Sequence, residues 1–272
     1  MDIQIWNTSD LSARLQDDAL VVLDVRRGER FANGHIPGAR NYSVYGINTY
    51  DTDDAPLASF VKMWAFQLAL AGITREHTVV ICGERSDEAA ARAAWFLDWL
   101  GHPRTVLLDG GVQAWLAHGG ALTGDAAAPT ATRYEPELHA ARVATRHDVL
   151  AAIGDPHSVI LDTRSDDEWF GRDARGTARA GAIPGAVHQE WTAHVDARGC
   201  LLPPQVLRER FEAIGVTPER EIIAYCNTGY RSAHAYVALG LLGYPRVRNY
   251  VGSWQEWANR PECPVEVPSG DR

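Results

Sequence analysis

Short aliphatic runs recur along the chain, and each of them ends in a polar loop. Residues 19–24 and residues 158–162 contain the runs VVLD and VILD, which are typical of buried strands. Residues 79–82 and 222–225 form a second pair of such strands, and each is followed by a polar loop and an Ala-rich helical stretch. The helical stretches cover residues 88–100 and residues 232–242. This alternation of strand, loop and helix predicts a mostly parallel sheet with helices on both faces.

The same motifs occur twice along the chain and in the same order. LDVR and GHIPGA in the first half reappear as LDTR and GAIPGA in the second half. LGHPR and GGVQAW, which come later in the first half, correspond to LGYPR and GSWQEW. In chain order, the eight motifs begin at Leu23, Gly34, Leu100, Gly110, Leu161, Gly181, Leu242 and Gly252. Such a repeat indicates a duplicated unit, so the predicted fold class is α/β with one mostly parallel sheet in each half.

A segment without apolar periodicity separates the two halves. Residues 124–136, GDAAAPTATRYEP, are rich in Ala, Pro and Thr, which is typical of a linker. We therefore expect a first domain over residues 1–125, a linker over residues 126–137 and a second domain over residues 138–272. Each of these domains is long enough to bury a core of its own.

Composition and charge narrow the class of partner. The 272 residues are 46% hydrophobic and 22% charged, which is the balance of a folded soluble protein. The net charge of -9 gives no general attraction to nucleic acid or to anionic membranes, so we expect neither as a partner. Residues 1–15 show no basic segment followed by an apolar run, and no stretch has the length and apolarity of a membrane span. These features predict a cytoplasmic protein.

The cysteines form neither a CxxC pair nor a ligand spacing with histidine. The four are Cys82, Cys200, Cys226 and Cys263. Their spacing suggests neither a zinc site nor a disulfide framework, so we predict reduced thiols.

Cys226 differs from the other cysteines in its surroundings. It follows a predicted buried strand and opens the six-residue loop CNTGYR, after which Ser232 begins a predicted helix. In such a loop successive backbone N–H groups can point inward, and the helix N-terminus adds partial positive charge. This arrangement favours an anion and lowers the pKa of Cys226, whose thiolate is the nucleophilic form. Gly229 permits the tight turn, and Arg231 adds a permanent cation with donors suited to a sulfonate-like group.

Together these motifs resemble the tandem rhodaneses, which are thiosulfate:cyanide sulfurtransferases, and their mercaptopyruvate-using relatives. The resemblance covers nearly the whole chain, and its carriers are LDVR with GHIPGA, LDTR with GAIPGA, LGYPRV, YVGSWQEW and the loop that Cys226 opens before a helix. The closing run, GSWQEWANRPECPVEV, also resembles the end of bacterial two-domain members. The resemblance implies two tandem rhodanese-like domains, with the active cysteine in the second domain alone.

The resemblance also implies a reaction and a set of site residues. The loop cysteine of the family takes the outer sulfur of thiosulfate as a persulfide, releases sulfite, and passes the sulfur to cyanide or a thiol in a ping-pong cycle. It implies Cys226 as the catalytic residue, and no metal or organic cofactor. Asp162 and Arg164 are the residues expected to support the active region. The substrate-binding residues expected from the loop are Asn227, Thr228, Gly229, Tyr230, Arg231 and Ser232.

Two departures from the family pattern bear on the sulfur donor. Mercaptopyruvate sulfurtransferases usually carry CGSGVTA in the loop, and this chain differs from that pattern at Asn227, Thr228, Tyr230 and Arg231. Thiosulfate is therefore the expected donor. Many two-domain members have an arginine where this chain has Glu168. Two hypotheses stay open for three arginines of the following insertion, a compensating role and a solvated loop face; these are Arg172, Arg175 and Arg179.

Other function classes remain as alternatives. Phosphatases that share this fold use a longer Cys-x5-Arg loop, whereas this chain has Cys-x4-Arg, so phosphate chemistry is disfavoured. A 3-mercaptopyruvate sulfurtransferase is one alternative. A persulfide carrier that passes sulfur to a protein partner is another.

The first half lacks an equivalent of the loop cysteine. Strand register places Gly83, not Cys82, opposite Cys226. Cys82 then falls on a buried strand end, and the loop after it carries Glu84 and Asp87, whose charges oppose thiolate formation. We therefore expect Cys82 to be structural. A second active cysteine at this position is the alternative, because GERSDE also leads into a predicted helix.

Overall fold

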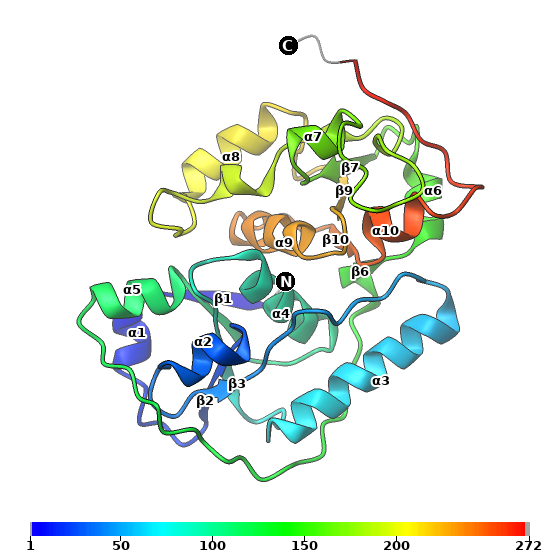
Figure 1. Cartoon of the computed structure of the whole chain (residues 1–272). Coiled ribbons are helices and arrows are strands. Elements are labelled where there is room, and N and C mark those ends of the chain that lie inside the picture. Colours follow the sequence, from blue (N-terminus) through cyan, green and yellow to red (C-terminus); the bar gives the residue numbers. More distant parts are fainter. Residues whose placement is uncertain (1, 270–272) are drawn as a thin grey trace. The chain divides into compact units, whose positions relative to one another are not determined.

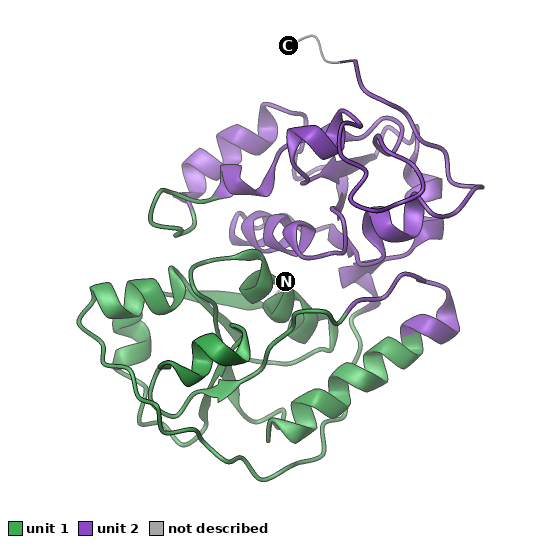
Figure 2. Cartoon of the chain, in the orientation of Figure 1, with its two compact units in different colours: residues 1–47, 58–139, 195–201 green, residues 48–57, 140–194, 202–272 purple. Residues whose placement is uncertain are grey.

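Two five-stranded parallel sheets form the framework of the chain (Figure 1). The computed structural model describes residues 2–269. Among these, the first unit comprises residues 2–47, 58–139 and 195–201, and the second comprises residues 48–57, 140–194 and 202–269 (Figure 2). The α/β fold predicted from the sequence, with one mostly parallel sheet in each half, is confirmed.

The first unit holds the sheet with strand order β1-β5-β4-β2-β3, in which every pair is parallel. Its strands are β1 (Ile3–Trp6), β2 (Leu20–Asp24), β3 (Arg40–Asn41), β4 (Thr78–Cys82) and β5 (Thr105–Leu108). The helices are α1 (Thr8–Ser12), α2 (Gly28–Ala32), α3 (Asp54–Leu70), α4 (Glu88–Trp99) and α5 (Gly111–Ala117). The first residues of α3, up to Leu57, belong to the second unit.

The second unit repeats this plan with the strand order β6-β10-β9-β7-β8. Its strands are β6 (Val143–Ala144), β7 (Ser158–Asp162), β8 (Val187–His188), β9 (Glu221–Tyr225) and β10 (Val247–Tyr250). Its α-helices are α6 (Arg146–Ala152), α7 (Asp166–Trp169), α8 (Pro204–Glu212), α9 (Arg231–Leu241) and α10 (Ser253–Trp257). Two short 3-10 helices, η1 (Ala140–Arg142) and η2 (Trp191–His194), complete it.

The strands and helices predicted from periodicity are all present, each within one residue of its expected bounds. The reason is burial: β4 and β9 each have a strand on either side, and four of their five residues are buried. The helices that follow them, α4 and α9, are Ala-rich and almost completely buried. Among the described helices, none combines the length and apolarity that crossing a membrane requires.

Register makes the two sheets directly comparable. Asp24 of β2 pairs with Cys82 of β4, and Asp162 of β7 pairs with Tyr225 of β9. Cys82 therefore corresponds to Tyr225, and the next residue, Gly83, corresponds to Cys226. In a parallel sheet the carboxyl ends of neighbouring strands lie at one edge, so the loops after β7 and β9 meet there.

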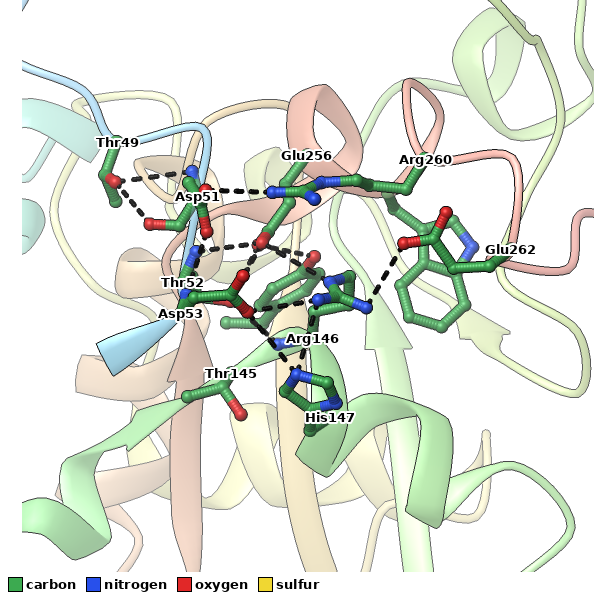
Figure 3. Close-up of polar contacts among 12 residues, drawn as sticks. Thr49, Asp51, Thr52, Asp53, Thr145, Arg146, His147, Glu256, Arg260 and Glu262 are labelled. Atoms are coloured by element: carbon green, nitrogen blue, oxygen red, sulfur yellow. Dashed lines mark hydrogen bonds and ion pairs between the residues drawn. The ribbon is translucent and has the colours of Figure 1, made fainter. Parts of the chain in front are cut away.

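Residues 48–57, which come from the first half of the sequence, are bound into the second unit. The backbone N–H of Thr52 donates to Oε1 of Glu256 at 2.8 Å, and its hydroxyl donates to Oε2 at 2.8 Å. Tyr250 donates to the same carboxylate at 2.9 Å, and the side chain of Glu256 is fully buried. Figure 3 shows Glu256 pointing from its helix toward Thr52.

Arginines extend this network around the same segment. The backbone N–H of Arg146 donates to the Thr52 hydroxyl at 2.9 Å, and its guanidinium pairs with Asp53 at 3.0 Å. Arg260 pairs with Asp51 at 2.9 Å (Figure 3). The segment therefore supplies donors and counter-charges that the second unit would otherwise lack.

A segment from the second half of the sequence is likewise part of the first unit. In residues 195–201, the carbonyl of Gly199 accepts from the Ser86 N–H at 2.9 Å, and the Leu201 N–H donates to Asp109 at 2.9 Å. The residues expected as a linker, 126–137, also pack in the first unit. There, Thr132 donates from its backbone to Ala69 at 2.9 Å and from its hydroxyl to Ile73 at 2.6 Å.

The Thr52 contacts predict a measurable stability effect. Thr52→Val keeps the volume but removes one donor to the buried Glu256 carboxylate and the acceptor of the Arg146 N–H. We expect a loss of about 2 kcal/mol in the free energy of unfolding, because hydrogen bonds to buried charges contribute most. Urea denaturation measures it, with Thr130→Val at an exposed threonine as the control. Equal stability of the two variants would contradict the role of Thr52.

Candidate active site

Cys226 lies at the carboxyl end of β9, and the loop that it opens leads directly into α9. The side chain is 1% exposed, and Tyr225 before the loop and Ser232 after it are fully buried. Gly229 has a φ of +84°, a backbone conformation that side chains other than glycine rarely adopt. This turn folds the loop back over the sulfur of Cys226.

Donors from the loop and the helix converge on this sulfur. The Gly229 N–H donates to Sγ at 3.1 Å, and the Ser232 hydroxyl lies 3.6 Å from it. The backbone N–H groups of Thr228 and Ser232 also stabilise its anionic form. The sequence expected such a ring of inward N–H groups, and this geometry has that form.

The pKa of the Cys226 thiol is lowered from its ordinary value. Burial alone opposes ionisation, but the charge of Arg231 and hydrogen bonds from Ser232 and Thr228 outweigh it. A lowered pKa increases the fraction of Cys226 that is thiolate at neutral pH, and the thiolate is the form in which cysteine acts as a nucleophile.

A second set of polar contacts holds the loop from outside. The Cys226 N–H donates to the Ser253 hydroxyl at 3.1 Å, and its carbonyl accepts from the Trp254 N–H at 3.0 Å. Asn249 accepts from the Ser232 hydroxyl at 2.7 Å and donates to the Gly229 carbonyl at 3.1 Å. Sequence reasoning noted the GSWQEW motif but did not assign these roles to Asn249 and Ser253.

Arg231 is held by Glu168. Its Nη1 and Nη2 atoms lie 2.5 Å and 2.8 Å from the two carboxylate oxygens of Glu168. Burial tends to raise the pKa of Glu168, but the hydrogen bond and charge of Arg231 lower it to about 2. The sequence placed Arg231 among the substrate-binding residues, and both of its terminal nitrogens are engaged by a carboxylate of the protein.

Asp162 and Arg164 form a fully buried pair behind the loop. Arg164 donates from Nε and Nη2 to the Asp162 carboxylate at 3.0 Å and 2.5 Å, and Tyr225 donates to the same carboxylate. Arg164 also donates to the Gly181 carbonyl at 2.8 Å and lies 4.3 Å from the ring of Trp254. Through Tyr225, the pair links the ends of β7 and β9, and its supporting role in catalysis stays a prediction.

The remaining loop side chains are less enclosed. Asn227, Thr228 and Tyr230 are half-buried. The Oδ1 atom of Asn227 is buried and accepts no hydrogen bond from the described residues.

The three arginines of the insertion after α7 have different surroundings. Arg179 donates to the carbonyls of Trp257, Ala258, Arg260 and Cys263, at distances of 2.6 to 3.0 Å. Arg172 pairs with Asp167 on the surface, and Arg175 is exposed. These contacts favour a structural role for Arg179 and a solvated loop face for the other two.

In the first unit, a carboxylate occupies the equivalent loop. A Cβ built on Gly83 would lie 2.6 Å from the Asp87 carboxylate, so the glycine leaves room for it. Asp87 accepts from the N–H groups of Glu84 at 2.9 Å, Arg85 at 3.3 Å and Ala90 at 2.9 Å. Burial raises the pKa of Asp87 to about 6 despite these donors. The same kind of N–H cradle therefore holds an oxygen anion in one unit and a cysteine sulfur in the other.

Cys82 lacks the environment of Cys226. Its side chain is fully buried on β4, and burial together with the charge of Asp24 raises its pKa well above the ordinary value. These surroundings fit the structural role expected from the sequence.

Potential metal ligands gather elsewhere. Among the described residues, one group of acidic and histidine side chains, Asp2, Asp98 and His139, brings its ligand atoms within 4.8 Å of one another. Two of the three are exposed, and Asp98 accepts a hydrogen bond from the Asp2 backbone at 3.2 Å. We assign no metal to this group.

The Glu168 contacts predict how acid affects stability. A carboxylate whose pKa falls from 4.5 to about 2 on folding stabilises the protein above pH 4.5, and this contribution is lost as the pH falls toward 2. We expect Glu168→Gln to cost about 3 kcal/mol at pH 7. The cost should shrink steadily below pH 4.5 in urea denaturation series.

Glu209→Gln, at an exposed glutamate of α8, is the control and should show no such dependence. A cost for Glu168→Gln that stays constant from pH 7 to pH 3 would contradict the assigned ion pair.

Comparison with known proteins places most of the chain in one family. The family model described as Rhodanese-like domain matches the chain twice, at residues 7–118 and 145–260. The thiosulfate sulfurtransferase of Pseudomonas aeruginosa is 36% identical over 262 residues, which cover 95% of each chain. The sulfur carrier protein TtuD of Thermus thermophilus is 33% identical over 274 residues, again covering 95% of each chain.

One more relative and one solved structure are also similar to this chain. A Pseudomonas aeruginosa protein named probable 3-mercaptopyruvate sulfurtransferase is 34% identical over 278 residues, with 96% of this chain and 97% of that protein covered. The crystal structure of an anaerobic ergothioneine biosynthesis enzyme from Chlorobium limicola has the same fold, with a TM-score of 0.87 at 22% identity. The match covers 98% of this chain and 70% of the chain of that enzyme. By the paired family matches and these relatives, the chain belongs to the rhodanese family of sulfurtransferases and carries the rhodanese-like domain twice.

Proposed function

We propose that the protein transfers a sulfane sulfur from thiosulfate to cyanide or a thiol through a persulfide on Cys226. The observation that carries this proposal is the convergence of donors on the Cys226 sulfur, together with its lowered pKa. The name of the Pseudomonas aeruginosa relative, thiosulfate sulfurtransferase, supports the same donor.

The first half of the proposed cycle loads the sulfur. The Cys226 thiolate attacks the outer sulfur of thiosulfate and forms a new S–S bond. The S–S bond within thiosulfate breaks, and sulfite leaves with the electron pair. In the second half, cyanide or a thiolate attacks the outer sulfur of the persulfide, and Cys226 leaves as a thiolate, so no outside oxidant or reductant is needed.

The loop suits the charge of this intermediate. A persulfide carries its negative charge on the outer sulfur, so the charge moves outward from Sγ as the sulfur is loaded. Fixed N–H donors stabilise such a charge without reorganisation, as they do in an oxyanion hole. The Gly229 N–H and the start of α9 are the described donors placed for this role.

The loop residues support thiosulfate rather than mercaptopyruvate as the donor. The residues after Cys226 differ from the CGSGVTA pattern of mercaptopyruvate-using members at several positions, among them Arg231. Arg231 is engaged by Glu168, so its fork is offered to neither a carboxylate nor a sulfonate.

A persulfide carrier that serves a protein acceptor is the second candidate. The name of the Thermus thermophilus relative, a sulfur carrier protein, supports it. The chemistry at Cys226 would be the same up to the persulfide, and only the acceptor would differ.

A donor comparison tests the proposal. With cyanide as acceptor, we expect thiocyanate from thiosulfate, with a kcat/KM at least about tenfold above that for 3-mercaptopyruvate, a difference of about 1.4 kcal/mol. Cys226→Ser should lower the thiosulfate rate by a factor on the order of 10³ or more, because it removes the nucleophile. Cys200→Ser, at a partly buried cysteine of the first unit, is the matched control and should stay active.

Each outcome separates the candidates. Comparable turnover in Cys226→Ser would contradict the mechanism, and a preference for mercaptopyruvate would contradict the donor. Sulfur loading without turnover on cyanide would favour the carrier.

A further inference from the structure

Arg231 is a cation close to the Cys226 sulfur, and it lies where the loop meets α9. It is the last residue of the loop CNTGYR that Cys226 opens and the first residue of α9. Its charge is the strongest of the influences that lower the pKa of Cys226. Its side chain is 17% exposed. An anion that enters the loop would meet this guanidinium if its donors were free.

Those donors are engaged by one carboxylate. Glu168 binds both terminal nitrogens of Arg231 in a two-point arrangement, at 2.5 Å and 2.8 Å. Such paired contacts between a guanidinium and a carboxylate are strong and fix the orientation of both groups. The fork that arginine normally uses to bind a carboxylate or sulfonate is therefore occupied.

Glu168 is itself held in place. It is 2% exposed and stands at the third position of α7, where Ser165 caps the helix. The Ser165 N–H and hydroxyl donate to its Oε2 at 3.2 Å and 3.0 Å. With its pKa near 2, the carboxylate stays charged at neutral pH. Glu168 is thus a fixed internal anion that competes with any external anion for Arg231.

We propose that Glu168 is a specificity-determining residue, which withholds Arg231 from the sulfur donor and leaves the backbone N–H groups of the loop to bind it. This inference rests on the proposed function. Its consequence is that sulfur donors are selected by how well their small terminal sulfur fits the loop. A second anionic group on the sulfur donor gains no contact with Arg231. Removing the Glu168 charge should make the guanidinium available to external oxyanions.

The test uses binding of inorganic sulfate and needs no sulfur transfer. Iodoacetamide, a neutral reagent, alkylates Cys226, and mass spectrometry of the peptide that contains this residue follows the rate. Sulfate bound at the loop slows alkylation, and chloride keeps the ionic strength constant across the series. The sulfate concentration that halves the rate is the measured quantity, and each variant serves as its own reference.

We expect Glu168→Gln to lower that sulfate concentration by about tenfold, the effect of freeing a charge-assisted hydrogen bond. The gain should vanish in the double variant Glu168→Gln/Arg231→Gln, because the guanidinium that provides it is gone. Circular dichroism establishes that the variants are folded. Glu168→Asp, which keeps the charge, should stay close to the unsubstituted protein.

Two results would overturn the inference. One is equal protection by sulfate in the unsubstituted protein and Glu168→Gln, and the other is a gain that persists without Arg231. If sulfate protection changes as expected while thiosulfate gives no thiocyanate, the proposed function fails and the inference about Arg231 stands.

Discussion

Convergence of backbone donors on one buried sulfur is the constraint around which the second unit is organised. The Gly229 N–H and the start of α9 can reach the Cys226 Sγ only because β9 ends at Tyr225 and the loop closes within five residues. Burial by itself would keep the thiol protonated, and the donors with Arg231 reverse that tendency. Asn249, Ser253 and the buried pair of Asp162 and Arg164 hold the backbone that carries those donors. If these contacts were removed, the donors would move away from Sγ and the pKa of the Cys226 thiol would rise.

In the duplicated first unit, the equivalent loop also directs backbone N–H groups at one side chain. Asp87 places a carboxylate against the N–H groups of Glu84, Arg85 and Ala90, and Gly83 leaves space for it. In the first loop, the Asp87 carboxylate therefore takes up backbone N–H groups, whereas in the second loop such a group points at the Cys226 sulfur. The second loop begins with the Cys226 sulfur instead, and its proposed chemistry is the gain and loss of a second sulfur atom at that position.

Local patterns made much of this predictable from the sequence. The buried strands, the repeat and the Gly83 to Cys226 equivalence follow from periodicity and motif order, because each depends on neighbouring residues. The pairing of Arg231 with Glu168 could not be predicted, since the two are 63 positions apart and meet only when β7 and β9 align. The exchange of residues 48–57 and 195–201 between the units also escaped prediction, because their contacts with Glu256 and Asp109 are long-range. Arg179 had no sequence signal for its four carbonyl partners.

The central claim is that the Cys226 sulfur accepts a second sulfur atom. Mass spectrometry of the protein after brief exposure to thiosulfate, followed by removal of the donor, tests it most directly. The account predicts one added sulfur atom, confined to the peptide that contains Cys226 and lost when cyanide is added. No added sulfur, or sulfur on Cys82, Cys200 or Cys263 instead, would contradict it.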